Sequence, residues 1–137
     1  MNKQTVSVFL FTSTVFTFGA NPDGRSVGRP VAEFIRAQMT SIGFSVESLV
    51  EATEGWELNT CISGQRFLLF IHWAPIGNEA INYWVIQIRK PWSFKKFFKM
   101  AEEDVTIAVQ GVSKAITQRN EIQDGRWVTD AEFRALY

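Results

Sequence analysis

The sequence predicts an α+β fold in the order β-α-β-β-β-β-α-β-α. We expect an antiparallel sheet of about five to six strands with two main helices packed on one face. Strand-like segments outnumber helical ones, and six Leu stand against 23 Val plus Ile, a balance typical of sheets. Only two long segments repeat apolar residues at helical spacing. The 137 residues amount to a single α+β domain, 1–137, with enough chain to bury a core without disulfides.

The first strand is expected within Thr5–Phe18, as one strand or a bulged pair, because this segment is rich in β-branched and aromatic residues. A lysine before the apolar run and Gly19-Ala20 after it loosely imitate a secretory signal. Threonines and a serine interrupt that run, and Phe18 stands where a cleavage site needs a small residue. The single cysteine fits a reducing compartment, so we expect a cytoplasmic protein.

The clearest helix follows a loop at Gly19–Arg29. Pro30 suits the first helical turn, and Gly43 is placed to end the helix. Between them, apolar residues recur at helical spacing, at Val31, Ile35, Met39 and Ile42.

Four strand-like segments come next, separated by turn-forming residues, at Phe44–Val50, Trp56–Ile62, Phe67–Trp73 and Asn82–Lys90. After a short segment at Ser93–Met100, a helix of about Glu103–Gln118 carries one apolar stripe and begins with acidic residues, as the helix dipole favours. Trp127-Val128 is typical of a short strand. Thr129-Asp130-Ala131-Glu132 is a capping box that opens a last helical turn or two, through Tyr137.

The hairpin turns assign the side chains of the central strands to two faces. A turn at Gly64-Gln65 sets Glu57 opposite His72, and a turn about Gly77-Asn78 sets His72 opposite Tyr83. Because side chains alternate along a strand, one face collects large apolar residues. We expect this inner face to lie beneath the helices, with Trp56, Leu58, Thr60, Ile62, Phe67, Leu69, Ile71, Trp73, Trp84, Ile86 and Ile88.

The opposite face, here called the mixed face, is half polar and holds Glu57, Asn59, Cys61, Leu68, Phe70, His72, Tyr83, Val85, Gln87 and Arg89. Its candidate binding surface is the subset Glu57, Asn59, Phe70, His72, Tyr83, Val85 and Arg89. A row of Glu57, His72 and Tyr83 can bind a polar ligand or move a proton. Cross-strand polar pairs that merely decorate a sheet are the favoured explanation, because structural pairs far outnumber catalytic ones. The apolar members predict that the N-terminal segment, a second copy of the chain or a partner covers this face.

Other chemistry has little support in the sequence. One His and one Cys give no metal-site spacing, and no nucleophile elbow or phosphate loop occurs, so we expect no metal, no cofactor and no enzyme. A weak basic patch at Lys95, Lys96 and Lys99 is interleaved with aromatic residues. Acidic residues follow at 102–104 and the net charge is zero, so an amphipathic turn is favoured over nucleic-acid binding.

Several short motifs resemble those of a loose group of small uncharacterised bacterial α+β proteins. They are Gly28-Arg29-x-x-Ala32-x-x-Ile35 before Gly43, Glu54-Gly55-Trp56-Glu57, Trp84 in a later strand, and Arg126-Trp127. Proteins of that group occur in mobile gene cassettes and beside toxin genes. The usual acidic-acidic-x-Gly-Trp pattern is reduced here to Thr53-Glu54-Gly55-Trp56. The resemblance supports the fold and implies no catalytic residues.

These observations favour a small cytoplasmic interaction protein, encoded on a mobile element, that uses the mixed face. Its expected partner is itself, as a homodimer, or another protein. One alternative is a small-molecule-binding domain or enzyme with a Glu57–His72–Tyr83 pocket, and another is a toxin-neutralising, immunity-type protein. Nucleic acid is not expected as a partner because the net charge is zero, and a membrane is not expected because no segment is apolar enough to span a bilayer.

Overall fold

The computed structural model describes residues 6–16, 28–52, 55–62, 64–76, 81–89 and 102–136. It confirms the α+β class and the predicted element order. The elements are β1 (Val8–Thr12), α1 (Arg29–Ser41), β2 (Ser45–Glu51), β3 (Trp56–Ile62), β4 (Gln65–Ile76), β5 (Ile81–Arg89), α2 (Glu102–Ile116), β6 (Gln123–Val128) and α3 (Asp130–Leu136).

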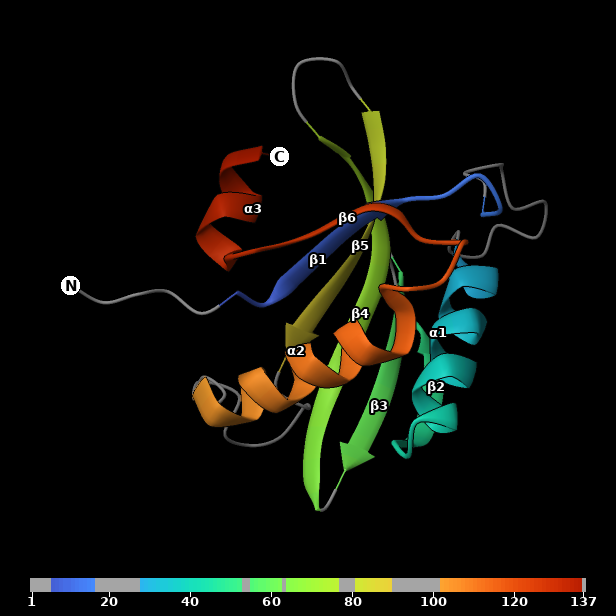
Figure 1. Cartoon of the computed structure of the whole chain (residues 1–137). Helices are drawn as coiled ribbons and strands as arrows, with labels where there is room; N and C mark the ends of the chain where they lie inside the picture. Colours follow the sequence, from blue (N-terminus) through green and yellow to red (C-terminus); the bar gives the residue numbers. More distant parts are fainter. Residues whose placement is uncertain are drawn as a thin grey trace.

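The six strands form one antiparallel sheet in the order β2-β3-β4-β5-β1-β6. The first strand, β1, therefore lies inside the sheet, between β5 and β6, and β6 forms the edge beyond it. Figure 1 shows α1 and α3 on opposite sides of this sheet. β1 is shorter than predicted, because residues 14–16 bend away after Thr12.

The inner face packs against α1 and α2, as predicted. From the strands, the main core cluster takes Phe9, Phe11, Trp56, Leu58, Phe67, Leu69, Ile71, Trp84, Ile86 and Ile88. From the helices it takes Val31, Ala32, Ile35, Met39, Ala108, Val112, Ala115 and Ile116. Thr60 is buried on the same face. Trp73 has the predicted parity but is 40% exposed and lies outside the main core cluster.

Glycines set both ends of α1. Gly28 precedes the helix with a φ of 112°, and Pro30 occupies its first turn. Gly43 follows the helix with a φ of 105°, a left-handed conformation that favours glycine. The predicted bounds of this helix are thereby confirmed.

The short helix α3 lies on the mixed face, and the predicted capping box begins it. The Thr129 amide donates to Glu132 Oε1 at 3.0 Å, and the Glu132 amide donates to Thr129 Oγ1 at 3.1 Å. Phe133 then packs with Val8, Leu10, Ala74, Val85 and Val128 in a second apolar cluster. The predicted covers were the N-terminal segment, a second copy of the chain or a partner, but helix α3 covers part of the mixed face instead.

The strand registers correct the predicted pairings. Ile62 pairs with Gln65, so the turn lies one position earlier than expected, with Gly64 at a φ of 82°. The β3–β4 partners consequently move by two residues, and Glu57 lies opposite Phe70. The β4–β5 partners are also displaced by two residues, with His72 opposite Val85 and Tyr83 opposite Ala74, and the turn predicted at Gly77-Asn78 lies outside the described residues. The direct row of Glu57, His72 and Tyr83 is therefore wrong. A shift of two residues preserves the parity, and hence the assignment of side chains to faces.

Two further predictions concern the basic patch and the absence of a membrane-spanning segment. The segment Ser93–Met100, with the basic patch Lys95, Lys96 and Lys99, lies outside them. Within the described ranges, no helix combines the length and apolarity needed to cross a bilayer.

Candidate functional site

The mixed face divides into two parts. Beneath α3 lie the buried residues His72, Ala74 and Val85, with the half-buried Tyr83 beside them. The other part, here called the open half, consists of half-buried or exposed side chains from four adjacent strands. These are Val50, Glu57, Asn59, Phe70, Gln87 and Arg89, none of which belongs to the cluster under α3.

The register aligns the open half around Phe70. Val50, Glu57, Phe70 and Gln87 are successive cross-strand partners on β2, β3, β4 and β5. Val50 is 48% exposed at the edge of this row, so apolar surface extends beyond the ring. The open half is thus a stripe across the sheet with an aromatic side chain at its centre.

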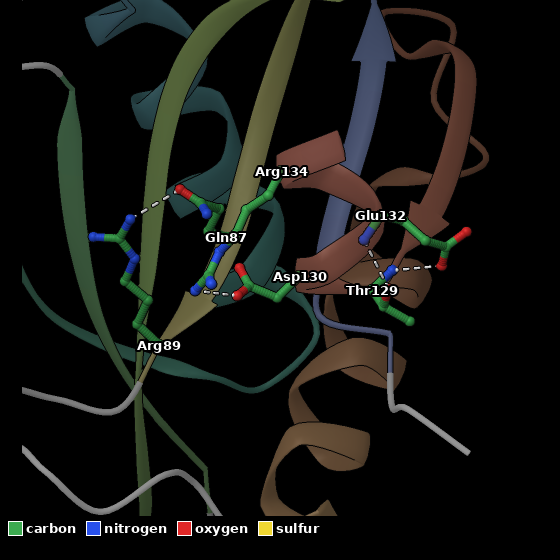
Figure 2. A network of polar contacts seen from close by, with 6 residues as sticks. All are labelled: Gln87, Arg89, Thr129, Asp130, Glu132 and Arg134. Carbon is green, nitrogen blue, oxygen red and sulfur yellow. Dashed lines mark hydrogen bonds and ion pairs between the residues drawn. The ribbon is translucent and has the colours of Figure 1, made fainter. Parts of the chain in front are cut away.

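Arg89 covers one side of the Phe70 ring. Its guanidinium carbon lies 4.5 Å from the ring centroid, and Nη2 donates to Gln87 Oε1 at 3.0 Å. Figure 2 shows Arg89 reaching Gln87 from two residues further along β5, where both side chains lie on one face. The aromatic face and the amide oxygen together hold the cation in one orientation.

His72 anchors the open half to the part under α3. Its side chain is buried, with ring Nε2 2.8 Å from Gln87 Oε1 and ring centroids 4.8 Å from Phe70 and 6.1 Å from Phe133. Because Arg89 also donates to Gln87 Oε1, that oxygen accepts, and Nε2 must carry a hydrogen to bond with it. His72 therefore holds Gln87, which in turn holds Arg89.

The open half carries one acid and one base that form no ion pair with another described residue. Among the described residues, Glu57 and Arg89 are absent from the ion pairs, which join Arg29–Glu33, Arg66–Glu47, Arg119–Glu121 and Arg134–Asp130. The Gln87 amide nitrogen likewise has no partner in the described part of the chain, since both bonds to Gln87 use its oxygen. Both charge types and an amide donor thus surround Phe70.

The remaining predicted residues serve local structure. Asn59 Nδ2 donates to Ser48 Oγ at 2.8 Å, which links β3 to the edge strand β2. Val85 is fully buried under α3 and is a core residue rather than a contact residue. Tyr83 packs at the border of the same cluster. Glu57, Phe70 and Arg89 therefore remain as the accessible members of the predicted surface.

Gln87 is the functional candidate that sequence reasoning missed. It belongs to the predicted mixed face but not to the candidate binding surface predicted there. Its signal in the sequence is its position two residues before Arg89 on the same strand, where both side chains share a face.

Metal chemistry finds no support among the described residues, where no three His, Cys, Asp or Glu side chains are grouped to hold an ion. Glu57, His72 and Tyr83 are diagonal neighbours, with backbones about 7–8 Å apart at each step. The geometry therefore offers an ordered surface for non-covalent contact.

No protein-family model, no curated protein and no solved structure matches this chain.

Proposed function

We propose that this chain is an interaction protein that binds a protein partner through the open half of its mixed face. The observation that carries the proposal is the arrangement of Phe70, a partly exposed aromatic residue held between Arg89 and His72. Aromatic residues and arginine are enriched at the centres of protein interfaces, where they contribute most of the binding energy.

Preorganisation supports this role. The Arg89 side chain is held by the Phe70 ring and by Gln87, so less conformational entropy is lost when it meets a carboxylate. Flanking polar residues, Glu57 and Gln87, supply the hydrogen-bonding rim that interfaces typically have. The stripe is apolar at its centre and polar around it.

Acid–base catalysis has less support. A Glu57–His72–Tyr83 pocket relied on direct contact along one row, and each of these residues faces an apolar partner instead. His72 is engaged with Gln87 and packed against Phe133. We retain the cytoplasm as the proposed compartment, on the cysteine content alone.

Photo-crosslinking tests the proposal. The chain carrying p-benzoylphenylalanine at position 70 is expressed in the organism that encodes it and irradiated in intact cells. The matched control carries the same group at Ile107, a 39% exposed position on α2. We expect one discrete adduct from position 70 that weakens when Arg89→Ala is added, and none from position 107.

The adduct's mass identifies the partner. A product of twice 15.6 kDa indicates a second copy, whereas another mass indicates a different protein, a neutralised toxin included. Equal, diffuse labelling from both positions, or no adduct from position 70, would contradict the proposed function.

A further inference from the structure

The open half places opposite charges on the two sides of one aromatic ring. Glu57 lies on β3, directly opposite Phe70, and Arg89 lies on β5, two residues beyond the partner of Phe70. Strand spacing puts their backbones about 12 Å apart, with the ring between them. A partner carrying a single type of charge would meet a like charge at one of these two positions.

We infer that the partner is a second copy of this chain, bound through a two-fold symmetric contact of the open halves. This inference rests on the proposed function and specifies its partner. In a two-fold contact the same patch meets itself, so each residue that touches another is touched by it in return. A patch with an acid on one side and a base on the other is complementary to itself under such a rotation.

A two-fold axis running along β4 past Phe70 gives Glu57, Arg89 and the Gln87 amide nitrogen partners across the contact. It sets β3 of one copy over β5 of its partner, so that Glu57 faces Gln87 and lies diagonal to Arg89. The carboxylate then accepts from the amide nitrogen of Gln87 and from the guanidinium of Arg89. Both contacts occur twice, and the two Phe70 rings meet near the axis.

Two other features favour this contact. The chain's net charge is zero, so two copies do not repel each other at long range. Pairing through the β2 edge of the sheet is disfavoured, since β2 has a register shift between Val46 and Ser48 and carries the acidic residues Glu47 and Glu51. The other edge strand, β6, also pairs irregularly, with a register shift opposite Leu10 and Thr12 of β1. Face-to-face contact is therefore better supported than edge-to-edge pairing.

Charge reversal on the full chain tests the inference by sedimentation velocity, from about 1 μM to about 1 mM. We expect the unsubstituted chain to dimerise, and Glu57→Arg or Arg89→Glu alone to weaken dimerisation at least tenfold, because both symmetric pairs become repulsive. An equimolar mixture of the two variants should dimerise again, since each reversed residue then meets its opposite. Arg36→Glu on α1 and Glu103→Arg on α2, both exposed, are the matched controls and should dimerise normally.

Circular dichroism of each variant confirms folding, because the reversed side chains belong to no core cluster. A monomeric unsubstituted chain throughout this range, or variants that do not recover on mixing, would overturn the symmetric contact. If crosslinking at position 70 still yields an adduct of another mass, the contact surface stands and only the identity of the partner is wrong. If it yields none, the proposed function fails as well.

Discussion

Gln87 Oε1 accepts a hydrogen bond from His72 Nε2 at 2.8 Å and another from Arg89 Nη2 at 3.0 Å. One amide oxygen thereby connects a buried ring under α3 to an exposed cation on the open half. Since His72 also packs against Phe133, the position of Arg89 depends on side chains from β4, β5 and α3. The open half is therefore held in place by the part of the mixed face that α3 covers.

The first prediction concerns the hydrogen on His72. Because Gln87 offers its oxygen, we expect Nε2 to carry a hydrogen at neutral pH. Long-range ¹H–¹⁵N correlation spectra of the imidazole measure this directly. Gln87→Leu, which removes the acceptor, should shift the Nε2 resonance and broaden the signals of the Arg89 side chain. A ring with hydrogen on Nδ1 alone would contradict this arrangement.

The capping box predicts a cost for losing its hydroxyl. Thr129→Ala removes the acceptor for the Glu132 amide and should lower the free energy of unfolding by about 1 kcal/mol. In this variant, backbone amide hydrogen exchange should accelerate more in α3 than in α1. Thr129→Ser, which keeps the hydroxyl, serves as the control and should retain most of the protection. Unchanged exchange in α3 after Thr129→Ala would show that the cap does not hold the helix.

Glu132 gives the cap a defined pH dependence. The hydrogen bond from the Thr129 amide holds the pKa of the Glu132 carboxyl below its ordinary value of 4.5. A lowered pKa means that the stabilisation is present at neutral pH and is lost as the pH falls through the folded-state value. Thermal unfolding of Glu132→Gln should consequently differ from that of the unsubstituted chain at pH 7, and the difference should shrink below pH 4.5. Glu103→Gln, on the exposed side of α2, should show no such convergence.

Gly111 in α2 allows close packing against Phe44. A β-carbon at this position would lie 2.7 Å from Phe44 Cε2, closer than such atoms approach. Gly111→Ala gains up to about 1 kcal/mol of helix propensity but should still destabilise the chain overall, because overpacking costs about 1–3 kcal/mol. Urea unfolding measures the net effect. Adding Phe44→Leu to Gly111→Ala should relieve part of the loss, and two purely additive losses would contradict this packing.

The division of strand side chains between the inner face and the mixed face could be predicted, because it depends only on whether a residue occupies an odd or an even position along its strand. Apolar side chains at alternate positions in Phe67–Ile71 and Trp84–Ile88 are enough to choose the inner face, even with every pairing displaced by two residues. The pairings themselves depend on where the turn lies. Gly64 fits either position of a two-residue loop, so composition could not fix the register.

The cover on the mixed face could not be predicted from the sequence. The capping box at Thr129 predicts a helix. Which face of the sheet that helix packs against depends on which strand β6 pairs with. β6 pairs with β1, a contact between the two ends of the chain that local patterns do not encode. The same contact brings Phe133 over His72, and so divides the mixed face into a covered and an open part.

The most direct test compares aspartate substitutions at two phenylalanines of β4. Phe67 is 1% exposed in the main core, whereas Phe70 is half-buried beside the cationic Arg89. Urea unfolding, at a concentration where the chain sediments as a single copy, should show that Phe70→Asp costs no more than about 2 kcal/mol and that Phe67→Asp costs about 4 kcal/mol or more. Equal losses, or a larger loss from Phe70→Asp, would show that Phe70 serves folding and that the open half is not a contact surface.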